Sequence, residues 1–122
     1  MNDYLEYIQD FCDNDEASAG WRIDPKTGEK LDVNKEFGTK IALCHSELSE
    51  ALEGHRKDRM DDHLPHRKAV EVEFADTLIR IFSLAGWMKL DLAGALTEKL
   101  EYNRKRADHK PENRAKEGGK KF

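Results

Sequence analysis

Acidic residues recur at intervals of three in two separate stretches of the sequence. SELSEALE at residues 46–53 carries Glu47, Glu50 and Glu53, and EVEFAD at residues 71–76 carries Glu73 and Asp76. Residues three apart share one face of a helix, about 60° around its axis. Each stretch also borders a row of apolar residues. We therefore expect two neighbouring helices to direct carboxylates into a shared seam.

Several carboxylates in one seam would repel one another. Like charges three or four residues apart on a helix destabilise it by about 0.2–0.5 kcal/mol per pair, and burial makes the repulsion worse. Divalent cations remove this repulsion, because Mg²⁺ takes oxygen ligands in an octahedral shell that water and phosphate complete. The two acidic stretches therefore predict a magnesium site, with Glu53 lying one helical step beyond it.

Other metal centres fit the sequence less well. A ferritin-like di-iron site needs Glu-x-x-His on two helices, and none of the five histidines lies three residues after a glutamate. His63 and His66 flank Pro65, which prevents a helical face there, so we interpret HLPH as a polar turn. Cys12 and Cys44 form no CxxC pair and are expected to be free thiols.

A further polar group lies near the end of the sequence. Lys99, Asn103 and Arg106 are spaced i, i+4 and i+7, which places them on one helical face. Lys and Arg donate hydrogen bonds to phosphate oxygens, and Asn donates or accepts. Taken alone, these cations are better explained by the favourable interaction of positive charges with the dipole at a helix C-terminus. Beside a carboxylate–metal site, a phosphate-binding role is favoured.

The elements that must position these residues are helices. Apolar residues recur at intervals of three and four over residues 2–16, 35–57, 66–85 and 91–106, and we predict a helix over each range. Asn34 is expected to cap the second helix, and residues 17–34 are expected to form a long loop, often a binding element. No useful segment shows a β period. The predicted fold class is all-α and four-helix-bundle-like.

Length and charge predict one domain and a tail. A chain of 122 residues supports a single domain, placed at residues 1–106, and residues 107–122 are expected to form a basic, partly flexible tail. Residues 1–98 carry 12 Lys and Arg against 21 Asp and Glu, whereas residues 99–122 carry 9 against 4. This distribution excludes the broad basic face of a duplex-DNA binder. It fits a site that gathers cations with one part and phosphates with another.

Composition also predicts location and assembly. No apolar run approaches the ~20 residues of a membrane span, and the first residues lack a signal-peptide pattern. We therefore expect a cytoplasmic protein without membrane or nucleic-acid polymer partners. Only 38% of the residues are hydrophobic, so a monomer would have a thin core. Self-association through helix faces would relieve that.

Together these motifs resemble the MazG-like branch of the all-α nucleoside triphosphate pyrophosphohydrolases. That family carries E-x-x-E, a variable spacer, E-x-x-D, and then a helix with K-x-x-x-N-x-x-R. The corresponding segments here are SELSEALE, EVEFADTL and KLEYNRKR. The resemblance spans roughly residues 16–110 and includes the Gly20–Trp21 pair.

The resemblance implies Mg²⁺-dependent cleavage, with Mn²⁺ as a substitute, between the α- and β-phosphates of an NTP or dNTP. The products are a nucleoside monophosphate and pyrophosphate, in house-cleaning or nucleotide-pool control. A homodimer or dimer of dimers with sites between subunits is also implied. The implied metal ligands and catalytic residues are Glu47, Glu50, Glu73 and Asp76. The implied substrate-binding residues are Lys99, Asn103 and Arg106, and Trp21 in the long loop is a candidate for stacking on the base.

Two other functions stay open at the level of the sequence. One is a non-catalytic helical oligomerisation or interaction module that uses its acidic face for partners. The other is a helical phosphohydrolase with a His/Asp metal centre, which the lack of a histidine followed directly by an aspartate disfavours.

Overall fold

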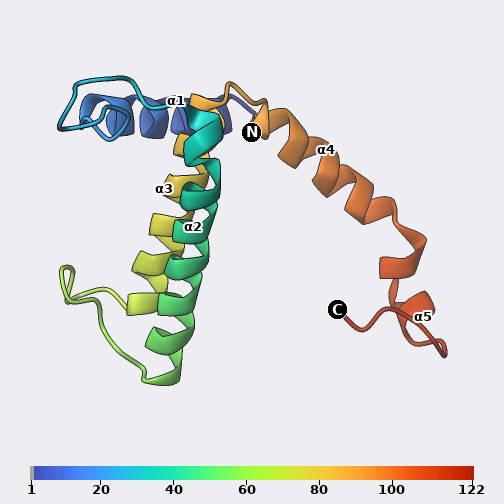
Figure 1. The fold of residues 1–122 in the computed structure, drawn as a ribbon. Coiled ribbons are helices and arrows are strands. Elements are labelled where there is room, and N and C mark those ends of the chain that lie inside the picture. The colour runs from blue at the N-terminus through green and yellow to red at the C-terminus, as the bar shows by residue number, and fades with distance from the viewer. Residues whose placement is uncertain (1) are drawn as a thin grey trace.

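The computed structural model describes residues 2–122 and consists of helices joined by loops (Figure 1). The helices are α1 (Asn2–Ser18), α2 (Val33–Arg56), α3 (Ala69–Trp87), α4 (Leu92–Lys105), a 3-10 turn (Ala107–His109) and α5 (Pro111–Arg114). Within residues 2–122 the β pairing consists of two isolated bridges, Ile23 with Lys30 and Met60 with Lys68. The predicted all-α class is confirmed, and the helix packing is compatible with a helical bundle.

The hairpin of α2 and α3 forms the centre of the molecule, with α1 lying across its end (Figure 1). Small residues allow the close crossing of α1 and α3, where Ser83 Oγ donates a hydrogen bond to the Cys12 carbonyl at 3.0 Å. Helix α4 leads away from the hairpin and packs on α1. Gln9 helps to hold this arrangement, because its Nε2 donates to the Leu90 carbonyl at 2.9 Å.

The helix boundaries differ from the predicted ones where a cap or loop intervenes. Asp32 caps α2, and its side chain accepts from the Asn34 N–H at 2.9 Å. The prediction that Asn34 is the cap is therefore wrong, because Asn34 already lies inside the helix. Helix α3 begins at Ala69 instead of residue 66, since the Lys68 N–H donates to the Glu71 carboxylate at 3.2 Å.

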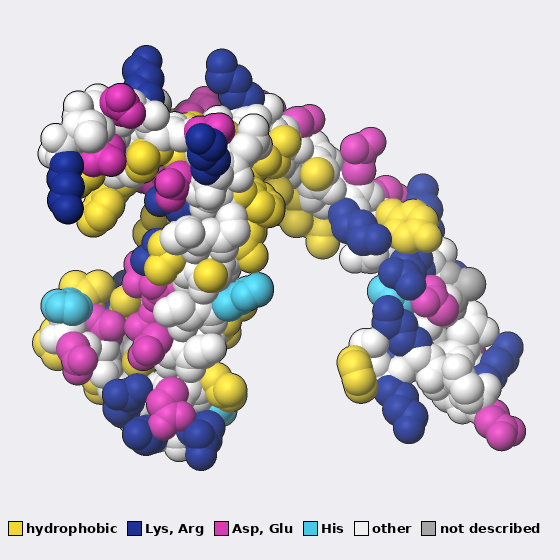
Figure 2. Space-filling model, viewed as in Figure 1, with side chains coloured by type: hydrophobic (Ala, Val, Ile, Leu, Met, Phe, Trp, Pro, Cys, Tyr) yellow, Lys and Arg dark blue, Asp and Glu magenta, His cyan; other side chains and the backbone are white. Residues whose placement is uncertain are grey.

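The predicted tail contains short helices. Residues 107–122 include the 3-10 turn and α5, and the Arg114 guanidinium donates to the carbonyls of Lys120 and Lys121 at 3.2 and 3.0 Å. Basic side chains gather over the far end of α4 and over α5, whereas acidic side chains gather along the middle of the hairpin (Figure 2). The charge division that the sequence shows is thus also a division in space.

The hairpin leaves large apolar side chains uncovered. Leu48 and Leu52 on α2 are 46% and 63% exposed, and Phe74 and Leu78 on α3 are 53% and 54% exposed. The buried hydrophobic residues are mostly small, namely Cys12, Cys44, Ala51, Ala69, Leu84, Ala85 and Ala93. This is the thin core expected from the composition. Between residues 2 and 122 we find no helix with both the length and the apolar character that crossing a membrane requires.

Candidate metal centre

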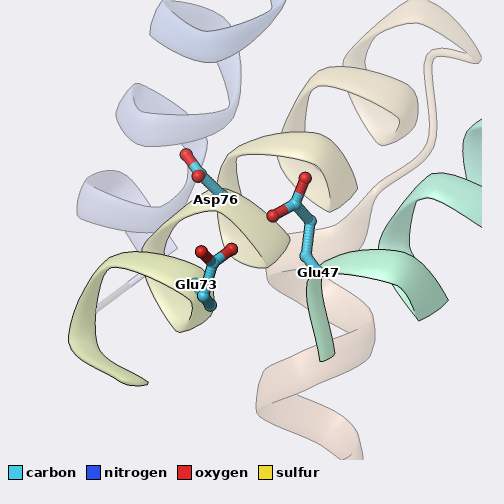
Figure 3. Close-up of side chains that lie close together, drawn as sticks. All are labelled: Glu47, Glu73 and Asp76. Atoms are coloured by element: carbon cyan, nitrogen blue, oxygen red, sulfur yellow. The ribbon is translucent and has the colours of Figure 1, made fainter. Parts of the chain in front are cut away.

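Three of the predicted carboxylates meet between α2 and α3. Glu47 comes from α2, whereas Glu73 and Asp76 come from successive turns of α3 (Figure 3). One carboxylate oxygen of each residue lies within 4.8 Å of the others, and all three side chains are half-buried. We call these three residues the carboxylate cluster. An oxygen-only donor set of this kind suits a hard cation such as Mg²⁺.

Two members of the carboxylate cluster, Glu73 and Asp76, have raised pKa values. The pKa of Glu73 rises to about 7, first because its protonated form hydrogen-bonds to Glu47, then through burial and the neighbouring carboxylates. The pKa of Asp76 is also raised, by burial and then by the charge of Glu47. The cluster therefore holds a proton close to neutral pH when no cation is bound. Metal binding to such a site releases that proton.

Glu50 takes a different place from the other predicted ligands. Its side chain is exposed on α2, outside the group of three converging oxygens. Its charge still reaches the cluster, because it contributes to the raised pKa of Glu73. A step of three residues along α2 turns the side chain about 60° around the helix axis. Glu47 therefore faces α3, and Glu50 faces solvent.

Arg80 lies against the carboxylate cluster, and the sequence analysis missed it. Its Nε and Nη2 donate to the same Oε1 of Glu47 at 3.2 and 3.1 Å. Arg80 follows Asp76 by four residues, a spacing that places both on one face of α3. This spacing from Asp76 is the feature of the sequence that could have indicated Arg80. Arg80 partly neutralises the cluster, since its charge opposes the rise in the pKa of Asp76.

A cavity of about 240 Å³ opens beside the cluster, between α1 and α3. Asp76 and Arg80 line its α3 side, while Glu16 and Trp21 line the opposite side. Trp21 is 68% exposed, so it contributes little to the core. Its indole instead offers an aromatic face to a cavity lined by both polar and apolar residues. This position suits stacking on a flat ring.

Arg22 fixes the loop that carries Trp21. Its guanidinium forms ion pairs with Asp13 and Glu16, and it donates to the Ser83 carbonyl at 3.2 Å. The same group lies 4.9 Å from the ring centroid of Trp87. These contacts join α1, the loop and α3, and the Arg22 side chain is only 13% exposed. Arg22, from its place in the loop, therefore fixes the wall of the cavity through contacts with α1 and with α3.

Two of the predicted phosphate-binding residues, Lys99 and Asn103, lie on α4, which leads away from the hairpin (Figure 1). The third, Arg106, was predicted to be helical but is the extended C-cap residue that follows α4. Lys99 Nζ is 4.7 Å from the ring centroid of Tyr102, and Arg106 pairs with Asp108 at 2.7 Å. Among the described side chains, the buried Oδ1 of Asn103 has no hydrogen-bond partner. The fold therefore does not bring Lys99, Asn103 and Arg106 to the carboxylates of their own chain.

Comparison of the chain with family models, curated proteins and solved structures gave no match. What the site can do therefore follows from its own chemistry. It combines three converging carboxylates, a guanidinium that neutralises one of them, and an adjoining cavity with an exposed indole.

Proposed function

We propose that this protein is a Mg²⁺-dependent nucleoside triphosphate pyrophosphohydrolase, the activity that the MazG-like resemblance implies. The supporting observation is the convergence of Glu47, Glu73 and Asp76 from two helices. Hard oxygen donors within 4.8 Å of one another fit a divalent cation. The raised pKa of Glu73 fits it as well: a hydrogen bond to Glu47, burial and the neighbouring carboxylates favour the protonated form, and a bound cation would favour the charged form instead.

The reaction needs positioning and charge neutralisation more than covalent chemistry. When bound, Mg²⁺ supplies positive charge for the phosphates and an acidified water for attack on the α-phosphorus. Glu47, Glu73 and Asp76 hold the cation. Glu50 adds negative charge at the solvent side of the cluster. The P–O bond between the α-phosphorus and the bridging oxygen breaks, and pyrophosphate leaves.

The cavity beside the cluster is where we place the base. Asp76 belongs to both the cluster and the cavity lining, so the two features adjoin. Trp21 at the cavity edge offers a stacking face, and such stacking contributes about 1–3 kcal/mol per base. Arg22 keeps the Trp21 loop in place. Base and triphosphate thus occupy adjoining parts of one site.

A second copy of the chain completes this proposed site. The predicted phosphate-binding residues, on α4 and at its C-cap, lie away from their own carboxylates, and the hairpin exposes Leu48, Leu52, Phe74 and Leu78. Covering these half-exposed side chains would stabilise an assembly by about 1 kcal/mol each. We therefore propose a homodimer or dimer of dimers in which α4 of one copy serves the carboxylates of another.

Product analysis tests the activity. The protein is incubated with each NTP and dNTP in Mg²⁺, and the products are resolved by ³¹P NMR. We expect monophosphate and pyrophosphate in equal amounts. Glu47→Gln and Asp76→Asn should lower the rate at least about 100-fold with unchanged helical circular dichroism, because each removes a metal ligand. Glu98→Gln, an exposed glutamate on α4, is the matched control.

Two results would contradict the activity. Release of orthophosphate alone would place the cleaved bond elsewhere, and equal rates in wild type and both variants would remove the carboxylates from the chemistry. A protein that assembles but cleaves no nucleotide would favour the alternative, a non-catalytic oligomerisation or interaction module with an acidic face.

A further inference from the structure

Arg80 stands between the two halves of the proposed site. Its guanidinium donates two hydrogen bonds to Glu47, and the same side chain lines the cavity between α1 and α3. Both hydrogen bonds end on one oxygen, Oε1, so the pair lacks the two-oxygen fork of the strongest guanidinium–carboxylate contacts. The Arg80 side chain is also 35% exposed, and solvent weakens such pairs. Glu47 is therefore held by a partner that a divalent cation can replace.

We propose that Arg80 is a resident counter-ion of Glu47 that a divalent cation displaces and that then binds the substrate's phosphates. This role rests on the proposed function. In the metal-free protein, the single charge of Arg80 offsets part of the negative charge of the cluster. Once a doubly charged cation is held by Glu47, the guanidinium is repelled from it.

The displaced side chain can turn along the part of the cavity wall that adjoins the cluster, which leaves the Trp21 side of the cavity to the base. Arg80 already contributes to the lining of the cavity, so a change of side-chain rotamer is sufficient. Glu16 on the opposite wall is already paired with Arg22 and Lys40, at 3.2 and 3.8 Å, and Asp15 on that wall is exposed to solvent. A phosphate beside the cation is then the favoured partner, because a guanidinium binds two phosphate oxygens at once.

In an Arg80→Gln variant, the loss of the two roles should change the affinities for Mg²⁺ and for nucleotide in opposite directions. Removing a competing cation tightens Mg²⁺ binding, whereas removing a phosphate donor weakens nucleotide binding. A side chain that only supported the fold would weaken both when replaced. The Arg80→Lys variant keeps the charge and should retain most of the nucleotide affinity.

Calorimetric titrations of the full chain test this pair of effects. Mg²⁺ alone is titrated first, and then, at saturating Mg²⁺, each of the four dNTPs with a methylene group in place of the α,β-bridging oxygen. We expect Arg80→Gln to bind Mg²⁺ about tenfold more tightly and its preferred analogue about tenfold more weakly, about 1.4 kcal/mol in each case. The matched control is Arg56→Gln, which breaks an exposed pair with Glu53 on α2.

The side chain can also be followed directly by ¹H–¹⁵N NMR. The Arg80 Nε–Hε signal, assigned by its loss in Arg80→Gln, should shift with the same midpoint as Mg²⁺ binding. A signal that stays in place at saturating Mg²⁺ would overturn displacement.

The titrations separate failure of this role from failure of the proposed function. If wild type binds Mg²⁺ and Arg80→Gln binds it equally or more weakly, Arg80 is not a displaced counter-ion and the function stands. Tighter Mg²⁺ binding with unchanged analogue affinity overturns the role in phosphate binding. If wild type binds no Mg²⁺, the metal centre is absent, and both proposals fall.

Discussion

Replacing Glu73 by glutamine should stabilise the metal-free protein above pH 7. The pKa of Glu73 is about 7 instead of the ordinary 4.5, because its protonated form hydrogen-bonds to Glu47 and burial adds to the shift. The folded state therefore binds this proton more tightly than the unfolded state does. The resulting stabilisation is fully present below pH 4.5 and is lost as the pH rises through 7. Glutamine stays neutral at every pH, so the variant should not lose stability as the pH rises through 7.

The magnitude follows from the two pKa values. A rise from 4.5 to about 7 corresponds to about 3.5 kcal/mol, at about 1.4 kcal/mol per pH unit. Glu73 is half-buried, and solvent screens it from its neighbours, so we expect about 1–2 kcal/mol. For a domain of this size that is a difference of about 4–8 °C in Tm.

The assay is thermal unfolding in EDTA at pH 4 and pH 8, for wild type, Glu73→Gln and the control Glu98→Gln. At pH 8 the Glu73 variant should be more stable than wild type, and at pH 4 the two should agree. Glu98→Gln should follow wild type at both values, because Glu98 is exposed on α4. Superimposable pH profiles for wild type and Glu73→Gln would refute the reasoning, since the folded state would then not hold the Glu73 proton more tightly than the unfolded state does.

Three further predictions concern the metal, the loop and the assembly. Mg²⁺ at a hundred times its Kd should stabilise wild type by about 2.7 kcal/mol, and Asp76→Asn should remove most of this gain in thermal unfolding. Arg22→Met should lower the free energy of unfolding in urea by about 2–3 kcal/mol, because it removes the guanidinium partner of the half-buried Asp13 and leaves Glu16 with its longer pair to Lys40; a change below about 0.5 kcal/mol, the range of ordinary surface substitutions, would contradict that role. Leu52→Glu and Leu78→Glu should each yield monomers in sedimentation velocity, whereas Tyr4→Glu, on the exposed face of α1, should not; unchanged assembly in both would rule out the hairpin face as the interface.

Helical periodicity was sufficient to predict the helices but not all of their ends. The apolar spacing in the sequence places each main helix within a few residues of its observed range. The cap of α2 at Asp32 and the start of α3 at Ala69 depend on single hydrogen bonds. Several polar residues nearby are chemically able to form such bonds, so the spacing of apolar residues does not distinguish among them.

The sequence predicts which types of residue form the site, but not which of their side chains converge. The motif predicts carboxylates on two facing helices, and which of Glu47 and Glu50 faces α3 is decided by how the helices pack. The acidic motifs predict Mg²⁺ as the source of positive charge, so they give no reason to look for a cationic side chain. The four-residue spacing between Asp76 and Arg80 is nevertheless visible in the sequence. The direction of α4 depends on its contacts with α1 and is not encoded in the K-x-x-x-N-x-x-R motif itself.

Mn²⁺ binding measured by electron paramagnetic resonance tests the central claim most directly. Free Mn²⁺ is counted while the ion is titrated into wild type, Glu47→Gln, Glu73→Gln, Asp76→Asn and the control Glu98→Gln. We predict that wild type and the control bind Mn²⁺, that Mg²⁺ displaces it, and that each of the other three variants binds it at least about tenfold more weakly. Equal binding by all five proteins, or no binding by wild type at millimolar Mn²⁺, would contradict a metal centre formed by these carboxylates.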